Sequence, residues 1–159
     1  FLATAIGADG ASGGGLSLPA GGSLQPASLE SVQGRQHYIK MQGSDVFKFA
    51  VRIIEEAANR VVAEAGLNMD DITWLVPHQA NIRIIRSSAN RLGVPEERFF
   101  VNVDRYGNTS AASIGLALDE LAERGDLKSG DSVVLVGFGA GLTWSALVLK
   151  WFEGGRSGE

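Results

Sequence analysis

The sequence predicts an α/β fold built on a largely parallel sheet. Three observations lead to this class. Strand-length apolar runs alternate with helical patterns from residue 44 onward, a glycine follows each helical pattern, and one helical segment is apolar on every side. Strands that alternate with helices are typical of sheets whose strands run parallel beneath covering helices.

The composition is that of a globular protein, because 45% of the 159 residues are apolar and 20% are charged. Such a chain is long enough for one domain with a sizeable core. A net charge of −4 does not favour a nucleic-acid-binding protein. The longest weakly polar run, 133–149, is interrupted by glycines and is shorter than the roughly 20 residues of a membrane helix. We therefore expect neither nucleic acid nor membrane as a partner.

The chain contains no cysteine. This excludes disulfides, cysteine-based zinc sites and a cysteine nucleophile on this chain. We also expect no metal site.

Four segments are predicted along the chain. Residues 1–10 have neither an initiator methionine nor a basic region, and we assign them to the end strand of a preceding half. Residues 11–36 are rich in Gly, Ser, Pro and Ala, which is typical of a loop or linker. Residues 37–152 form the predicted domain, and 153–159 a flexible tail.

Helices are predicted at 44–65, 81–92 and 110–124, each ended by a glycine. Ser44 is the expected N-cap of the first. The third begins with "SAASIGLAL", which is small and apolar on every side. A helix apolar all round is buried all round, so we expect it between two sheets, one of them supplied from elsewhere. Strands are predicted at 72–76, 99–103, 133–136 and 143–151, the last two around a glycine turn.

Three features follow strands at the carboxyl edge of the sheet, where α/β proteins bind ligands. They are His78 in "WLVPHQANIRII", Asn108 in "YGNTS" and the loop "GFGAG" at 137–141. A neutral imidazole donates one hydrogen bond and an amide two, and donors aimed at one oxygen stabilise an enolate or a tetrahedral thioester intermediate.

Each feature also has a purely structural interpretation. The histidine is then a hydrogen-bonded structural residue, the asparagine a turn or cap residue, and the glycine loop a tight turn. The loop leads into a strand and lacks the spacing of a dinucleotide fingerprint. No G-x-S-x-G motif announces a nucleophile.

The strings "WLVPHQANIRII", "RYGNTSAASIGLAL" and "GFGAGLTWSALVLKW" resemble the C-terminal half of the β-ketoacyl-acyl-carrier-protein synthase III family, over about residues 38–152. The resemblance implies a thiolase-like αβαβα layered fold, of which this chain supplies the C-terminal half with one buried central helix. It implies a Cys-His-Asn triad with His78 and Asn108 as its histidine and asparagine. The cysteine would lie in the missing N-terminal half.

The implied reaction is the decarboxylative Claisen condensation of acyl-CoA with malonyl-acyl carrier protein that starts type II fatty acid synthesis. Both reactants are substrates, and no cofactor is expected. The resemblance further implies a homodimer of the complete protein in the cytoplasm. The isolated chain, without a cysteine, is expected to be inactive.

The resemblance also assigns roles to residues around the triad. The amide of Ala140 would belong to the oxyanion hole and Phe138 would line the site. The pantetheine channel would include Phe47, Ala80 and Asn81, and the acidic acyl carrier protein would dock on Arg83, Arg86 and Arg91.

Other functions stay open on the residues alone. One is a non-catalytic half-thiolase subunit that completes a partner's site. Another is a related thiolase-fold synthase of polyketide or quinolone type. A papain-type Cys-His-Asn hydrolase has similar chemistry, but the parallel α/β pattern and the absent cysteine weigh against it.

Overall fold

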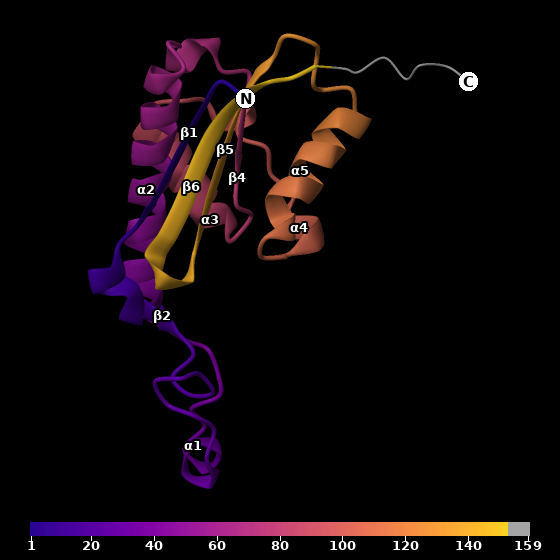
Figure 1. The fold of residues 1–159 in the computed structure, drawn as a ribbon. Coiled ribbons are helices and arrows are strands. Elements are labelled where there is room, and N and C mark those ends of the chain that lie inside the picture. Colours follow the sequence, from indigo (N-terminus) through magenta and orange to yellow (C-terminus); the bar gives the residue numbers. More distant parts are fainter. Residues whose placement is uncertain (153–159) are drawn as a thin grey trace.

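The computed structural model describes residues 1–152, and the tail predicted at 153–159 lies outside them. Its centre is a four-stranded sheet in the order β1-β6-β5-β4 (Figure 1). The strands are β1 (Ala3–Ala8), β4 (Trp74–Pro77), β5 (Ser132–Gly139) and β6 (Thr143–Lys150).

The α/β class is confirmed, and the pairing within the sheet is mixed. β4 and β5 run parallel, as predicted, whereas β6 is antiparallel to both β5 and β1. The physical reason lies in the turn Ala140–Leu142 (η4), which joins β5 to β6. A connection this short can only join antiparallel strands.

The strand predicted at 99–103 is wrong. Phe99 forms an isolated parallel bridge with Leu75, between the single turns η3 (Glu96–Arg98) and α4 (Val103–Tyr106). The pairing with β4 does not continue beyond Phe99, because the next backbone N–H that could join it, that of Asn102, is bound by the Gln79 side chain. The backbone N–H of Asn102 donates to Oε1 of Gln79 at 3.0 Å.

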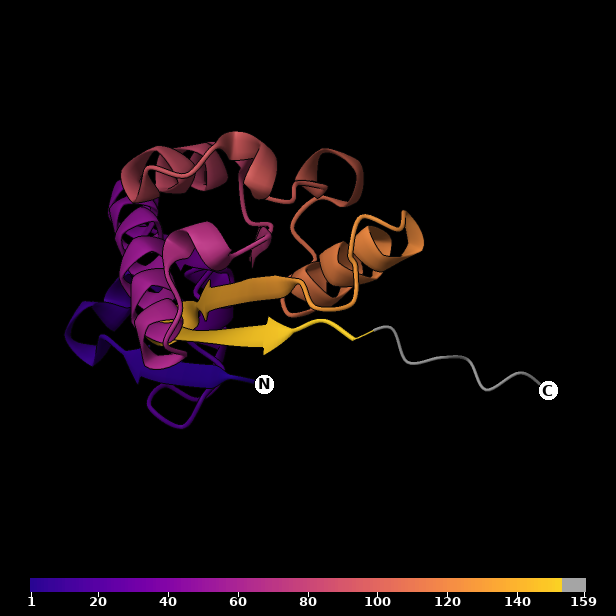
Figure 2. The same ribbon diagram turned by 90° about the horizontal axis from the view of Figure 1, so that it is seen from above.

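Two helices cover one face of the sheet and a third covers the other (Figures 1 and 2). α2 (Gly43–Glu64) and α3 (Ile82–Leu92) pack with the core that contains Val134 and Val136 of β5. α5 (Ala112–Glu123) packs with the core that contains Val133. Successive residues of a strand point to opposite faces, so β5 serves both cores.

The helix ends agree with the prediction in most places. Asn81 caps α3 and Gly93 ends it with a φ of +67°, which favours glycine. The prediction that Ser44 caps α2 is wrong: the helix begins at Gly43, behind Gln42, and the Ser44 hydroxyl donates to Asp45 instead.

α5 is buried along one face in this chain. Ser113, Ala117 and Leu121, spaced by four residues, face the sheet. Leu116, which lies outside this stripe, is 38% exposed. Burial of a second face by another layer stays a prediction.

The N-terminal segments contain a strand of the main sheet and several short elements. β1 is hydrogen-bonded to β6, so Ala3–Ala8 belongs to the same sheet as the C-terminal strands. The predicted linker contains η1 (Gly10–Gly15), β2 (Leu16–Ser17) and α1 (Leu29–Gln33), and β2 pairs with β3 (Lys40–Met41). α1 lies at the end of an arm that projects from the sheet (Figure 1). Within residues 1–152, no helix has the length and apolar character needed to cross a membrane.

Candidate active site

His78 directly follows β4 and extends its pairing with β5. Its backbone N–H donates to the carbonyl of Val136 at 2.8 Å. Its Nδ1 lies 2.6 Å from Oγ of Ser113, and its ring meets the ring of Phe138 edge-on, with centroids 5.3 Å apart. Burial lowers the pKa of His78, so the imidazole is neutral at pH 7.

Gln79 holds the end of β4 in place. Its Nε2 donates to the carbonyls of Pro77 at 2.9 Å and Phe100 at 3.1 Å, and its Oε1 accepts from Asn102. The side chain is almost completely buried, at 1% exposure. A buried amide that is fully hydrogen-bonded fixes its surroundings, so Gln79 sets where the neighbouring imidazole sits.

Ser113 joins this arrangement from the first turn of α5. Its Oγ accepts a hydrogen bond from the backbone N–H of Gln79 at 3.2 Å and contacts His78. Neither Gln79 nor Ser113 was singled out from the sequence. The available signals were weak: a glutamine straight after a buried strand, and a serine within an apolar helix start.

Asn108 lies in the loop between α4 and α5. Its Oδ1 accepts from the backbone N–H of Ser110 at 3.0 Å, which is a local turn. Because the oxygen is taken, the Nδ2 amide group is left to donate. Asn108 is exposed, and no hydrogen bond within residues 1–152 joins it to His78. An indirect path of hydrogen bonds joins them. Asn108 accepts from the N–H of Ser110, the carbonyl of Ser110 accepts from the N–H of Ser113 at 3.2 Å, and the Ser113 hydroxyl contacts His78.

The glycine loop brings Phe138 to His78 and leaves Ala140 exposed at the β5–β6 turn. The left-handed conformation of the turn falls on Gly141, with a φ of +71°, and Leu142, with a φ of +47°. Ala140 itself has a negative φ, so its Cβ is tolerated.

The residues predicted along the pantetheine channel gather at the N-termini of α2 and α3. The guanidinium of Arg83 lies over the ring of Phe47, 5.9 Å from its centroid. Asn81 accepts from the backbone N–H of Arg83 at 2.8 Å as the cap of α3. Ala80 is half-buried, and its N–H donates to the carbonyl of His78 at 2.9 Å.

The three arginines of α3 differ in their partners. Arg86 pairs with Glu96 at 3.3 Å, and Arg91 pairs with Glu55. Arg83 has no carboxylate partner within residues 1–152, and it is exposed. It is therefore the arginine whose charge is available to a partner.

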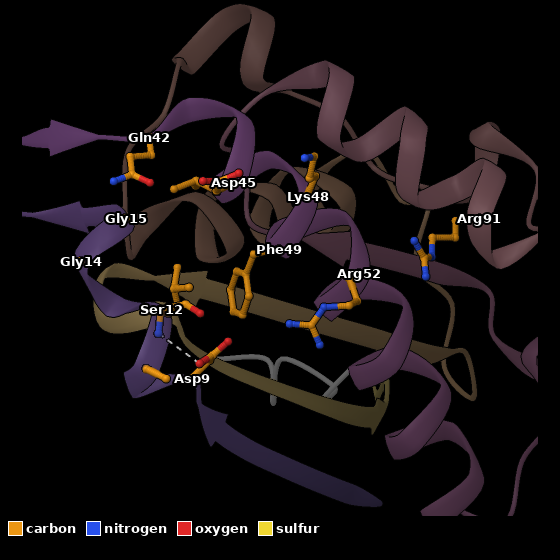
Figure 3. A pocket seen from close by; sticks show the side chains of 13 residues that line it. Asp9, Ser12, Gly14, Gly15, Gln42, Asp45, Lys48, Phe49, Arg52 and Arg91 are labelled. Atoms are coloured by element: carbon orange, nitrogen blue, oxygen red, sulfur yellow. Dashed lines mark hydrogen bonds between the residues drawn. The ribbon is translucent and has the colours of Figure 1, made fainter.

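A cavity of about 750 Å³ opens elsewhere, between η1 and α2 (Figure 3). Figure 3 shows Asp9 and Ser12 facing Phe49 and Arg52 across it. Arg91 also lines it, but His78 and Asn108 do not. The cavity is thus separate from the candidate active site.

The chain has a mixed sheet with α2 and α3 on one face and α5 on the other, which is the layering of one half of the thiolase fold. Residues 62–151 match the family model described as 3-oxoacyl-(acyl-carrier-protein) synthase III C terminal. The match covers more than half of the chain, and the chain belongs to this family.

Relatives support the same assignment. The β-ketoacyl-(acyl-carrier-protein) synthase III of Desulfitobacterium hafniense (strain DSM 10664 / DCB-2) is 53% identical over 98% of this chain and 47% of its own length. That of Clostridioides difficile (strain 630) is 55% identical over 95% of this chain and 46% of its own length.

Solved structures agree in fold. The synthase III of Thermus thermophilus superposes with a TM-score of 0.83 at 45% identity, over 96% of this chain and 46% of that one. That of Pseudomonas aeruginosa PAO1 gives 0.84 at 39% identity, over 96% and 44%. The chain thus spans about half the length of the relatives it matches, and the thiolase-like fold class is confirmed.

Proposed function

We propose that this chain supplies the histidine and asparagine half of a β-ketoacyl-acyl-carrier-protein synthase III. The observation that carries the proposal is how the side chains of His78 and Asn108 are hydrogen-bonded. Nδ1 of His78 contacts the hydroxyl of Ser113, and burial lowers the pKa of the imidazole, which favours its neutral form. Oδ1 of Asn108 accepts a hydrogen bond from the backbone N–H of Ser110. Nε2 of the histidine and Nδ2 of the asparagine are left to act on a substrate.

In this mechanism the acyl group passes from acyl-CoA to a cysteine of the other half, with CoA as the leaving group. Malonyl-acyl carrier protein then loses carbon dioxide, and the released electron pair forms an enolate. His78 and Asn108 donate to the thioester oxygen as its charge grows. The enolate carbon attacks the acyl-cysteine thioester, the cysteine sulfur leaves, and a β-ketoacyl carrier protein results.

The surrounding residues take supporting roles. The Ala140 amide serves the oxyanion hole, and Phe138, which packs on the imidazole, shapes the site. Phe47, Ala80 and Asn81 line the pantetheine channel. Arg83, with Arg86 and Arg91, docks the acidic acyl carrier protein. No cofactor is required, and the complete protein is a cytoplasmic homodimer.

The test is made in a full-length protein that contains this chain, with the two half-reactions measured separately. His78→Ala and Asn108→Ala should each slow decarboxylation of malonyl-acyl carrier protein by about 10²–10³, the typical cost of one lost oxyanion donor. Transfer of the acyl group from acyl-CoA should suffer less, above all in Asn108→Ala. Equal losses in both half-reactions would mean that the pair serves the nucleophile and not the enolate.

A second candidate is a non-catalytic subunit that completes a partner's site with His78 and Asn108. Mass spectrometry of the native protein separates the two. A longer chain, or an N-terminal half that co-purifies and bears one reactive cysteine, supports the synthase. A stable homo-oligomer of 159 residues supports the subunit.

A further inference from the structure

Ser113 is buried between the two polar groups nearest the imidazole. It is 2% exposed, its Oγ accepts from the backbone N–H of Gln79 at 3.2 Å, and the same Oγ lies 2.6 Å from Nδ1 of His78. Within residues 1–152 the hydroxyl makes no other hydrogen bond. The hydroxyl therefore has two partners, the backbone N–H of Gln79, which donates to it, and Nδ1 of His78.

The direction of the short bond follows from a count of hydrogens. A serine hydroxyl has one hydrogen to donate, and a neutral imidazole carries its proton on one nitrogen only. If Nδ1 carried the proton, Oγ would accept from both Gln79 and His78, and the buried hydroxyl hydrogen would have no acceptor. If Nδ1 is bare, the hydroxyl donates to it and every group is satisfied. Buried polar groups are almost always hydrogen-bonded, which selects the second arrangement.

We propose that Ser113 is a positioning residue, which donates to Nδ1 of His78 and thereby keeps the imidazole proton on Nε2. The role rests on the proposed function, in which His78 must donate from Nε2 to an enolate oxygen. It extends that function by naming the group that sets the tautomer. Gln79 takes part as well, because its N–H occupies a lone pair of Oγ and leaves the hydroxyl hydrogen to point at Nδ1.

The chain offers a matched control. Ser88 is also completely buried on a helix, but its hydroxyl donates to the carbonyl of Ile84 in its own helix at 2.9 Å. Ser88→Ala makes the same chemical change as Ser113→Ala without touching the imidazole. Ser113→Thr keeps the hydroxyl and should rescue the tautomer.

The experiment uses the full-length protein with ¹⁵N-labelled histidine, and the His78 signals are assigned by their loss in His78→Gln. Two-bond ¹H–¹⁵N correlations read the tautomer without substrate. We expect the proton on Nε2 in wild type and Ser113→Thr, and a mixture of tautomers in Ser113→Ala. Decarboxylation by Ser113→Ala should fall about tenfold, the rate equivalent of one ordinary hydrogen bond. Its thermal stability should change about as much as that of Ser88→Ala.

A proton on Nδ1 in the wild type would overturn the proposal even if no variant folded. So would a Ser113→Ala protein that loses stability like Ser88→Ala but keeps both the Nε2 tautomer and the decarboxylation rate. The proposed function fails by a different result, namely full condensing activity in His78→Ala. The two ideas can therefore be rejected separately.

Discussion

The guanidinium of Arg83 lies over the ring of Phe47, 5.9 Å from its centroid, and joins the N-termini of α2 and α3 at the candidate channel. The contact holds the cation without neutralising it. Arg86 and Arg91 on the same helix already have carboxylate partners. A substitution of Arg83 therefore tests carrier-protein docking without also breaking an ion pair within the chain.

We expect Arg83→Glu in the full-length protein to raise the KM for malonyl-acyl carrier protein and to leave acylation by acyl-CoA nearly unchanged. Charges at an interface rim act mainly on association and are screened by salt. The advantage of the wild type should therefore shrink as ionic strength rises. Arg86→Glu and Arg91→Glu should act in the same direction but more weakly.

The control for this series is Arg60→Glu, which breaks the Arg60–Glu64 pair at the far end of α2 and should change neither KM. Kinetics with both substrates at low and high salt provide the measurement. An equal loss with both substrates in Arg83→Glu would assign Arg83 to the shared pantetheine arm or to the fold.

The isolated 159-residue chain should form no β-ketoacyl product from acyl-CoA and malonyl-acyl carrier protein. It has no cysteine, so it cannot form the acyl-enzyme. The measurement is product formation by mass spectrometry, with a full-length relative as the positive control. Turnover by the pure chain would contradict the proposed mechanism.

Gln79→Ala should lower the free energy of unfolding by about 1–3 kcal/mol, the usual cost of leaving buried groups unpaired. It removes a donor from Pro77 and Phe100 and an acceptor from Asn102. Gln42→Ala is the matched control, because Gln42 is exposed and its side chain does not cap α2. Urea denaturation of both variants decides: equal stabilities would mean that Gln79 does not hold the end of β4.

Glu120 should make the stability depend on acid pH. Partial burial raises the pKa of its carboxyl, but hydrogen bonds from Asn102 and Arg105 and the charges of Arg105 and Arg124 outweigh this and leave the pKa lowered. A carboxylate with a lowered folded pKa stabilises the protein above its unfolded pKa of about 4.3. That contribution disappears as the pH falls through the folded value.

The substitution Glu120→Gln should therefore destabilise the protein at pH 7, and the difference from wild type should shrink below about pH 4.3. Glu64→Gln, which removes an exposed helix pair, should cost only about 0.3–0.5 kcal/mol. Thermal unfolding between pH 3 and 7 is the measurement, and a pH-independent difference would reject the ionic explanation.

His78 should titrate below its ordinary pKa of about 6.5, because burial disfavours the imidazolium. Since the unfolded chain takes up this proton more readily, the folded state should lose stability as the pH falls from about 6.5 to the folded pKa. Decarboxylation should decline through the same folded value. An NMR titration with a midpoint at or above 6.5 would show that His78 is not desolvated.

The sequence by itself determined the α/β class, the three main helices, the glycine stops and the place of His78 at the end of a strand. These follow from local physics: apolar periodicity, helix caps such as Asn81, and the left-handed conformation at Gly93. Local patterns also misled in two places. Ser44 is a good N-cap residue but lies inside α2, and 99–103 is apolar but forms no strand beyond one bridge.

The tertiary structure decided what each polar group bonds to. Gln79 takes the N–H of Asn102, 23 residues away, and Ser113 meets His78 across 35 residues. No local pattern encodes such pairs, because each residue is unremarkable in its own segment and gains its role only when β4 and α5 pack together. The sequence alone pointed to His78, whereas the Ser113 hydroxyl beside its Nδ1 could be found only once the chain had folded.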